Sequence, residues 1–387
     1  MLFYRIARRI ALGLCALLMA TPLASAQARD GQLQLTFAGD LMSHRWINDL
    51  DSYDTGLRDL APSLQDSDLA FVNVEFAVDP SRPLAGFPNF NGSIDYVRAA
   101  IRVGFNVFAL ANNHTMDYRI AGARATHESF IRLARESQIS YAGLGTAIVG
   151  TWGNHQFPPP EIRNVNGIRV GFVSISQISN VFWSDVYRQM VVVDASNRLE
   201  FLSYLRSVDQ EVDLLVVSYH GDVDDEYHLS AGATKRRVME SFAAAGADIV
   251  WGHHPHVVQE WSYPEVAGRR KLVLFSTGNL LSAQGRRLND ANPNPQNRWA
   301  DTHDGYLFHV TVQIAQNEAT VTELRTEPVF QRRLPGGERG FVVQPFAALM
   351  ESELRPAWRS YYVSRREHLI QRAARIESAA GLRGVAQ

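Results

Sequence analysis

Short hydrophobic strands alternate with helical segments through most of this 387-residue chain, and this alternation constrains the fold most strongly. Residues 69–74, 107–110 and 249–251 are apolar runs, bounded by polar residues, that are too short for helices. Segments such as 119–137 and 196–209 carry helical periodicity instead. Strands that alternate with helices are typical of layered α/β proteins, so we predict an α/β fold.

The later part of the chain departs from this alternation. Residues 305–329 have the pattern of two strands around Asn317, which predicts an antiparallel addition to a sheet. Residues 284–304 are rich in Asn, Pro and Arg, and we expect them to form a long surface loop.

The chain ends in an Arg-rich segment that is expected to be helical from about residue 342. The Arg residues within 365–376 could dock to a partner, but packing of their aliphatic stems on the fold is the default expectation. We find no internal repeat and no linker between domains. We therefore expect one main domain over residues 27–335 and a C-terminal helical extension over residues 336–387.

Residues 1–26 have the organisation of a signal peptide. Three Arg residues precede an apolar run from Ile10 to Ala20, Pro22 follows, and Ala24-Ser25-Ala26 has the small-x-small pattern of a cleavage site. The run is too short to span a bilayer comfortably, so removal is expected rather than anchoring. We expect an exported protein, periplasmic or extracellular, whose membrane contact would come only from an uncleaved N-terminus.

Composition excludes several classes of protein. Apolar residues make up 46% of the chain and charged residues 20%, which excludes disorder over most of its length. The net charge of −2 and the absence of a long basic run argue against a nucleic-acid partner. The single cysteine, Cys15, lies in the expected signal peptide, so the mature chain would have no disulfide or thiolate. Oxygen and imidazole ligands would have to bind any metal.

Five predicted strands end at residues that can bind a metal ion. These residues are Asp40, Glu75, Asn113, His220 and the pair His254 and His256. The carboxyl ends of parallel strands meet at one edge of a sheet, where α/β proteins bind ligands. A set of carboxylates, an amide and imidazoles without sulfur suits manganese, iron or zinc. It exceeds one tetrahedral zinc site and matches two divalent ions that share a bridging carboxylate.

Each of these residues also has an ordinary structural interpretation. Asp40 could be a turn residue or a helix N-cap, and His220 could hydrogen-bond to a strand end. The His254-Pro255-His256 unit is harder to explain in this way, because we expect an extended X-Pro-X unit to project both flanking side chains from a stiff backbone. Two neighbouring imidazoles are costly if both are charged, and metal binding keeps them neutral. The ordered pattern therefore favours a metal site.

Six short motifs, five of which contain these residues, follow one another along the chain. They are Gly39-Asp40-Leu41-Met42, Asn73-Val74-Glu75, Ala111-Asn112-Asn113-His114, His220-Gly221, Gly252-His253-His254-Pro255-His256 and Gly278-Asn279. The set resembles the CapA-type poly-γ-glutamate capsule synthesis proteins, which belong to the calcineurin-like metallophosphoesterase superfamily. The resemblance covers about residues 32–330. It implies a four-layer α/β/β/α sandwich with a two-metal site at one edge of the sheets.

The resemblance also implies a role for each residue. Asp40 and His256 would bind one metal, Asn113, His220 and His254 would bind the other, and Glu75 would bridge the two. His114 would be the general acid that protonates the leaving oxygen. Asp117 would either orient the His114 ring or cap the following helix. The remaining residues expected near the site are Asn112, Glu226, Asn279 and Arg45, the last as an anion ligand or as an ordinary surface residue.

The chain departs from the superfamily pattern at one metal position. The usual Asp-x-His opening reads Asp40-Leu41-Met42, so its histidine is absent. His44 could replace it, although an exposed loop residue is the simpler interpretation. The family's His-Trp-Gly motif reads His220-Gly221-Asp222, which changes expected substrate contacts rather than metal ligands.

Three functions remain compatible with the sequence. The first is an exported metal-dependent hydrolase that acts on a phosphoester or on an amide of an anionic envelope polymer. The second is a non-catalytic accessory protein that binds an anionic polymer or a partner of a capsule synthesis and export complex. The third is a purely structural α/β protein.

Overall fold

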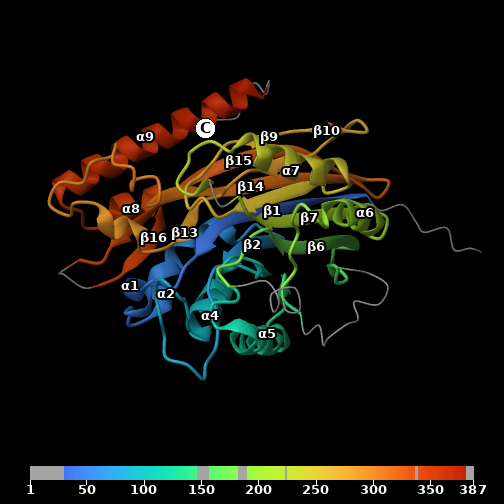
Figure 1. Ribbon diagram of the computed structural model, residues 1–387. Coiled ribbons are helices and arrows are strands. Elements are labelled where there is room, and N and C mark those ends of the chain that lie inside the picture. Colours follow the sequence, from blue (N-terminus) through green and yellow to red (C-terminus); the bar gives the residue numbers. More distant parts are fainter. Residues whose placement is uncertain (1–29, 146–156, 182–189, 223–224, 336–338, 381–387) are drawn as a thin grey trace, which may run out of the picture.

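The computed structural model describes residues 30–145, 157–181, 190–222, 225–335 and 339–380. The expected signal peptide and Cys15 lie outside these residues. Two sheets form the centre of the molecule (Figure 1). The eight-stranded sheet has the order β16-β15-β14-β1-β2-β3-β4, with β13 also paired to β1. The six-stranded sheet has the order β5-β6-β7-β8-β12-β9.

The predicted strands lie close to their expected ranges, and both sheets also contain strands that were not predicted. The eight-stranded sheet contains β1 (Gly31–Leu41), β2 (Leu69–Val74), β3 (Val107–Ala109), β4 (Ser140–Ala142), β13 (Asn279–Leu281), β14 (Asp304–Ala315), β15 (Glu318–Arg333) and β16 (Phe341–Pro345). The six-stranded sheet contains β5 (Glu161–Val165), β6 (Ile168–Ser176), β7 (Leu214–His220), β8 (Ile249–His253), β9 (Trp261–Ser262) and β12 (Leu272–Leu274). A separate hairpin joins β10 (Glu265–Val266) and β11 (Arg269–Arg270).

Helices and turns connect the strands. They are α1 (Arg45–Asn48), α2 (Tyr53–Leu57), η1 (Arg58–Leu60), α3 (Ala61–Leu64), α4 (Ile94–Val103), α5 (Arg119–Glu136), α6 (Arg198–Asp209), α7 (Ala233–Ala244), η4 (Gln284–Arg287), α8 (Phe346–Glu351) and α9 (Pro356–Ala379). Among the described residues, no helix is long and apolar enough to cross a membrane. The predicted mixed α/β fold is confirmed.

Parallel pairing brings the functional strand ends to common edges. β1, β2, β3 and β4 pair in parallel, as do β6, β7, β8 and β12. The antiparallel addition predicted around Asn317 is confirmed, since β14 and β15 form a long hairpin. Gln316 and Asn317 turn this hairpin with positive φ angles of 55° and 66°, a conformation that Asn tolerates well.

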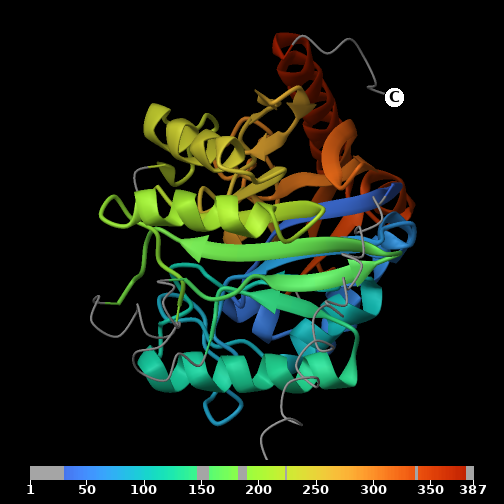
Figure 2. The ribbon, with the colours of Figure 1, turned by 90° about the vertical axis from the view of Figure 1, so that its right-hand side faces the viewer.

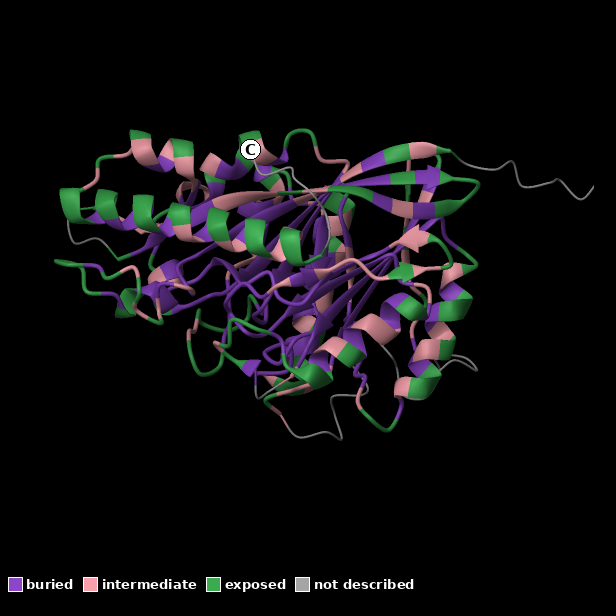
Figure 3. Ribbon diagram, turned by 90° about the horizontal axis from the view of Figure 1, so that it is seen from above, coloured by how far each residue is buried: buried purple, intermediate pink, exposed green. Residues whose placement is uncertain are grey.

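Aromatic side chains fill the space between the two sheets. Phe37 and Phe71 stack with ring centroids 4.5 Å apart, and Trp251 of the other sheet lies 5.6 Å and 5.9 Å from these rings. The indole N–H of Trp251 donates to the carbonyl oxygen of Ala38 at 3.1 Å, so β8 is fixed to β1 directly. Figure 3 shows the strands buried in the interior and exposed residues on the outer helix faces.

The outer face of each sheet packs against helices. In β7, Leu214 and Val216 face the core between the sheets, while Leu215 and Val217 pack with α6 and α7. Both faces are buried, which explains the unbroken apolar run in this strand. On the eight-stranded sheet, α4 and α5 contribute to a second cluster. Figure 2 shows α5 and α6 on opposite sides of the strands.

The C-terminal segment differs from the expected helical tail. Residues 341–345 form β16, which pairs with β15, so the helical part begins only at α8. Figure 1 shows α9 beside β15, and its Trp358 and Tyr362 join the cluster between the sheets. Residues 284–304 are likewise not a pure surface loop, because they begin with η4 and bury Leu288 and Ala300.

His303 is enclosed by the aromatic residues that anchor α9. The ring centroids of Phe341, Trp358 and Tyr361 lie 5.6, 5.9 and 6.2 Å from its own. Neither ring nitrogen has a hydrogen-bond partner in the part of the chain that the structure describes. Burial, and to a smaller extent the charges of neighbouring Arg residues, lowers the pKa of His303 from 6.5 to about 3.

Acid should therefore destabilise the protein through His303. The unfolded chain binds this proton near pH 6.5 and the folded chain near pH 3, so stability present above pH 6.5 is lost as the pH falls through this interval. His303 should make the free energy of unfolding fall by up to about 1.4 kcal/mol for each unit by which the pH decreases. We predict that His303→Leu removes this contribution, so that its free energy of unfolding falls less steeply with decreasing pH. Urea titrations of metal-free protein at several pH values measure both slopes, and identical slopes would contradict the prediction.

Candidate metal centre

The ends of β1 and β2 place two carboxylates in the interior. In the register of the sheet, Asp40 lies opposite Asn73 of β2 and Asn279 of β13. Its amide donates to the carbonyl oxygen of Gly278 at 2.9 Å. A Cβ atom at Gly39 would lie 2.1 Å from that same oxygen, so only glycine permits this close approach of the two strands. The Gly-Asp motif therefore has a structural reason as well as a chemical one.

Two imidazoles approach these carboxylates from the other sheet. His256 Nδ1 lies 3.4 Å from Asp40 Oδ2, and His256 Nε2 lies 3.8 Å from Glu75 Oε1. His220 Nε2 is also 3.8 Å from Glu75 Oε1. One ligand atom each from Asp40, Glu75 and His256 lies within 4.8 Å of the others, a spacing at which they could bind one metal ion together.

His254 joins this group through an unusual backbone. Its ring centroid is 5.3 Å from that of His220 and 6.2 Å from that of His256. The expectation of an extended X-Pro-X unit was wrong: His254 and His256 have φ angles of 95° and 58°. Such left-handed backbone at a non-glycine residue costs about 1–3 kcal/mol and concentrates at functional sites. The turn folds both imidazoles back toward the strand ends.

A second group of polar residues follows β3. His114 Nδ1 lies 2.7 Å from Asp117 Oδ2, which also accepts a hydrogen bond from the amide of Phe90. Asp117 therefore contacts the His114 ring, and α5 has no side-chain cap. Asn180 lies beside both Asn113 and His114, since its Oδ1 accepts from Asn113 Nδ2 at 3.3 Å and its side-chain nitrogen lies 3.2 Å from His114 Nδ1. No sequence motif pointed to Asn180.

Asn73 and His253 are further members that the sequence analysis did not assign. Asn73 Nδ2 donates to Asp40 Oδ1 at 2.8 Å and approaches Glu75 Oε2 at 3.4 Å. His253 Nδ1 contacts Asp40 Oδ1 at 2.8 Å. Each carboxylate is thus held in place through one of its oxygens, while its second oxygen can bind a metal ion. Both residues stand inside motifs already recognised, so their adjacency to predicted ligands was the signal that could have identified them.

Two asparagines support the loops around the cluster. Asn279 holds His256, because its Nδ2 donates to the His256 carbonyl oxygen at 3.1 Å and its Oδ1 lies 3.1 Å from His256 Nδ1. Asn112 Nδ2 donates to the Val74 carbonyl oxygen at 2.8 Å, and its Oδ1 accepts from the His114 amide at 3.2 Å. These contacts connect the loops after β2, β3 and β8.

The remaining expected residues lie at the periphery. Arg45 is 77% exposed and pairs with Asp49 at 4.0 Å. Glu226 is also exposed. His44, by contrast, is buried, so its interpretation as an exposed loop residue was wrong. Its Nδ1 accepts a hydrogen bond from the Ala283 amide at 3.4 Å.

Burial determines the charge state of the cluster. Burial raises the pKa of Asp40, but contacts with His253 and His256 outweigh this and hold it well below its usual range. Burial and the nearby Asp40 charge raise the pKa of Glu75 well above its usual range. Burial, followed by mutual repulsion of the imidazoles, lowers the pKa of His220 and brings that of His254 to about 3. These two imidazoles are neutral near pH 7 and can bind a metal.

Several buried polar atoms in this cluster have no hydrogen-bond partner within the described part of the chain. They are Asp40 Oδ2, Glu75 Oε1, Asn113 Oδ1 and both ring nitrogens of His220 and His254. Unpaired buried polar atoms are rare because each costs about 1–3 kcal/mol. Carboxylate oxygens and imidazole nitrogens that converge in this way fit a divalent cation. The cluster is therefore a candidate metal centre.

Known proteins share most of the segment that builds this centre. Residues 34–284 match the model of a protein family described as "Bacterial capsule synthesis protein PGA_cap". "Capsule biosynthesis protein CapA" of Bacillus anthracis is 26% identical over 265 residues, which cover 66% of this chain and 61% of that protein. "PGA biosynthesis protein CapA" of Bacillus subtilis (strain 168) is 23% identical over 262 residues, which cover 66% and 65%. The matches thus span less than two thirds of either relative.

Two solved structures are similar at low identity. A novel phosphatase from Mycoplasma pneumoniae has a TM-score of 0.43 and 11% identity, with 84% of this chain and 98% of that chain covered. A putative 5′-nucleotidase from Staphylococcus aureus, in complex with alpha-ketoglutarate, has a TM-score of 0.44 and 13% identity, with 76% and 54% covered.

The matched segment contains the ends of β1, β2, β3, β7 and β8, and so every residue predicted as a metal ligand. It also extends over well more than half of the chain, which confirms the family to which the sequence motifs pointed. This chain belongs to the bacterial capsule synthesis protein PGA_cap family.

Proposed function

We propose that this protein is an exported, metal-dependent hydrolase that acts on a phosphoester or on an anionic polymer of the cell envelope. The observation that carries the proposal is the set of unpaired buried donor atoms around Asp40 and Glu75. A cluster that served only folding would pair these atoms, because their desolvation is otherwise uncompensated. Export rests on the sequence pattern of residues 1–26, and the polymer on membership of the capsule synthesis family.

The donor set supports two divalent ions of manganese, iron or zinc. Asp40 and His256 would hold one, Asn113, His220 and His254 the other, and Glu75 would bridge them. When bound, such ions neutralise the anionic oxygens of a substrate and lower the pKa of a coordinated water. Asn73, His253 and Asn279 would keep the ligands oriented through the hydrogen bonds described above.

His114 is the residue best suited to move a proton. The Asp117 carboxylate can only accept a hydrogen bond, so the 2.7 Å contact supports a proton on His114 Nδ1. That arrangement leaves Nε2 to hold the proton that passes to the leaving group. Phe90 packs edge-on against the imidazole with ring centroids 4.5 Å apart and limits rotation of the ring. The Asp117 contact thus orients the proposed general acid.

A non-catalytic accessory role is the second candidate. It is favoured by one observation, the buried Met42 where the superfamily resemblance implies a histidine ligand. In that role the protein would bind an anionic polymer, or a partner in a capsule synthesis and export complex, through the same centre without turnover.

Removal of individual ligands should separate a metal site from a structural cluster. We predict that purified wild-type protein binds divalent metal, and that His254→Ala and Glu75→Gln each weaken the binding more than about tenfold. The reason is that each substitution removes one of few converging donors. Elemental analysis after loading with manganese, iron or zinc measures the content. The control His228→Ala alters an exposed histidine and should keep the wild-type content. A wild-type protein that holds far less than one ion per chain would contradict the proposal.

Substitution of His114 should separate catalysis from binding. We predict that His114→Ala lowers kcat for a phosphoester by about a hundredfold or more while metal content stays unchanged, because a positioned general acid contributes at least that much. Steady-state kinetics and elemental analysis on the same sample measure both quantities. A variant that hydrolyses at the wild-type rate would remove His114 from the chemistry. Capsule polymer output that survives His114→Ala but not loss of the protein would favour the accessory role.

A further inference from the structure

We propose that a pocket beside the metal centre, formed around Arg286 and Arg45, binds an anionic group of the substrate. The pocket has a volume of about 680 Å³ and lies between α1, the loop at 84–87 and η4. Its role as a substrate site rests on the proposed function, whereas its capacity to bind an anion does not.

Contacts between aromatic rings connect this pocket to the proposed general acid. His44 lines the pocket and packs edge-on against Phe90, with ring centroids 5.0 Å apart. Phe90 in turn packs against His114 at 4.5 Å. The side chains of His44 and Phe90 therefore lie between a ligand group in the pocket and His114. A substrate of several residues would extend from one place to the other.

Arg286 supplies a positive charge that has no carboxylate partner in the described part of the chain. Among the described residues, the one hydrogen bond of its guanidinium runs from Nη1 to the Ala283 carbonyl oxygen at 3.0 Å. Burial lowers the pKa of His44 to about 3 and the charge of Arg286 is the second cause, which is consistent with a guanidinium close to the pocket wall. His44 is thus neutral, and the remaining donors of Arg286 are free to bind an anion.

The other charged residues that line the pocket do not neutralise the positive charge of Arg286. Arg45 is 77% exposed, and its one ion pair with a described residue is the 4.0 Å contact with Asp49. Asp49 also pairs with Arg339 at 3.6 Å, so two guanidinium groups share one carboxylate. The pocket therefore carries a net positive charge that favours an anionic ligand.

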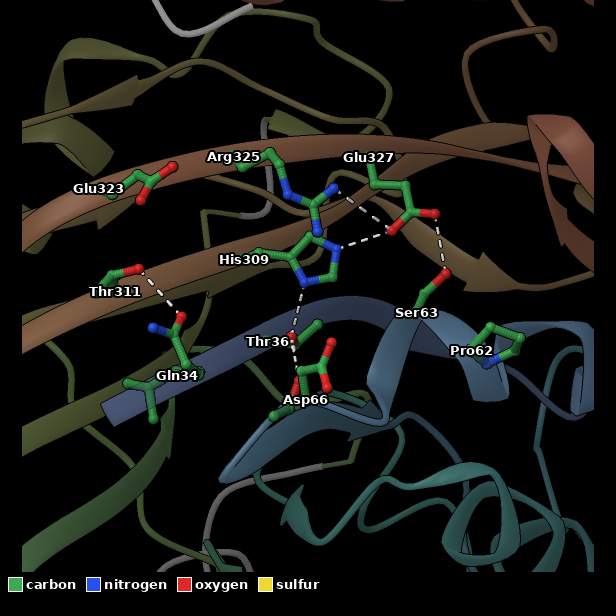
Figure 4. Close-up of a pocket in the computed structure, with 12 residues that line it drawn as sticks. Gln34, Thr36, Pro62, Ser63, Asp66, His309, Thr311, Glu323, Arg325 and Glu327 are labelled. Atoms are coloured by element: carbon green, nitrogen blue, oxygen red, sulfur yellow. Dashed lines mark hydrogen bonds and ion pairs between the residues drawn. The ribbon is translucent and has the colours of Figure 1, made fainter. Parts of the chain in front are cut away.

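A second pocket of comparable size provides a contrast (Figure 4). There Arg325 lies 3.8 Å from Glu327, whose carboxylate also accepts hydrogen bonds from His309 Nε2 and Ser63 Oγ, both at 2.9 Å. Glu323 lines the same pocket. The guanidinium is matched by acids on its own strand, so we expect little affinity for anions at this second pocket.

Part of the pocket lining is apolar. Phe87 is 76% exposed and Leu84 is 48% exposed, although large apolar side chains usually avoid water. A Cβ atom at Gly86 would lie 2.8 Å from the Arg45 amide, so the loop at 84–87 is held tightly against the arginine side. This arrangement fits an anionic group beside aliphatic carbon, such as the carboxylate of a polymer with methylene groups. A phosphate could satisfy the arginines without using the apolar part of the lining.

Binding measurements on the full chain test the proposal. Fluorescence anisotropy, in EDTA and again with manganese, would follow a labelled glutamate oligomer and a labelled linear polyphosphate. We expect Arg286→Gln to raise the Kd for the preferred probe about tenfold, because hydrogen bonds to charged groups contribute this much. The matched control Arg325→Gln should leave the Kd unchanged. Arg286→Gln that binds like the wild type, or an equal loss in Arg325→Gln, would overturn the proposal.

Further measurements identify the ligand and separate this proposal from the proposed function. If the natural ligand is a carboxylate polymer, Phe87→Ser should weaken binding of the glutamate oligomer and leave binding of the polyphosphate unchanged. If the natural ligand is a phosphate, Phe87→Ser should leave the binding of both probes unchanged. Arg286→Lys, which keeps the charge, should retain intermediate affinity and so confirm that folding is intact. Metal content of Arg286→Gln should equal the wild type. If the wild type binds no metal but Arg286→Gln still binds the probe more weakly than the wild type, the anion-binding pocket is supported and the proposal of a metal-dependent hydrolase is rejected.

Discussion

Two buried carboxylates, each satisfied through only one oxygen, are the constraint on which the site depends. Asp40 Oδ1 accepts from Asn73 and contacts His253, and Glu75 Oε2 approaches Asn73, while Asp40 Oδ2 and Glu75 Oε1 have no hydrogen-bond partner among the described residues. Desolvation of an uncompensated charge is expensive, so the fold tolerates this arrangement only if something else compensates it. A bound cation is the compensation that the surrounding imidazoles fit.

The packing of the two sheets creates this arrangement. Asp40 belongs to one sheet and His253 to the other, and their 2.8 Å contact crosses the interface between them. Trp251, two residues before His253, packs against Phe37 and donates to the Ala38 carbonyl oxygen. The aromatic core thus sets the distance between the strand ends that carry the ligands. Loss of this packing would separate the donors even if every ligand were kept.

Sequence patterns predicted the parts of the structure that depend on local order. Apolar runs identified β2, β7 and β8, and Asn317 identified the β14–β15 hairpin, because alternation and turn chemistry are local signals. The expectation that the polar residues at the strand ends lie close together then followed from the parallel arrangement of the strands. The assignment of Asp40, Glu75 and His256 to one cluster agrees with their spacing in the structure. Their roles as metal ligands remain predictions.

Features that depend on tertiary contacts were missed or wrong. Asn180 reaches His114 from a loop after β6, and no spacing in the sequence encodes that approach. The positive φ of His254 is imposed by the packed turn and contradicts the local preference for extended backbone before Pro255. His44 was expected to be an exposed loop residue, yet it is buried and packs against Phe90, which lies far from it in the sequence.

Anomalous X-ray diffraction from crystals grown with manganese tests the central claim most directly. The claim predicts strong anomalous peaks in contact with Asp40 Oδ2, Glu75 Oε1 and a ring nitrogen of His256. The absence of any peak within reach of these three atoms, in protein loaded with excess metal, would contradict it.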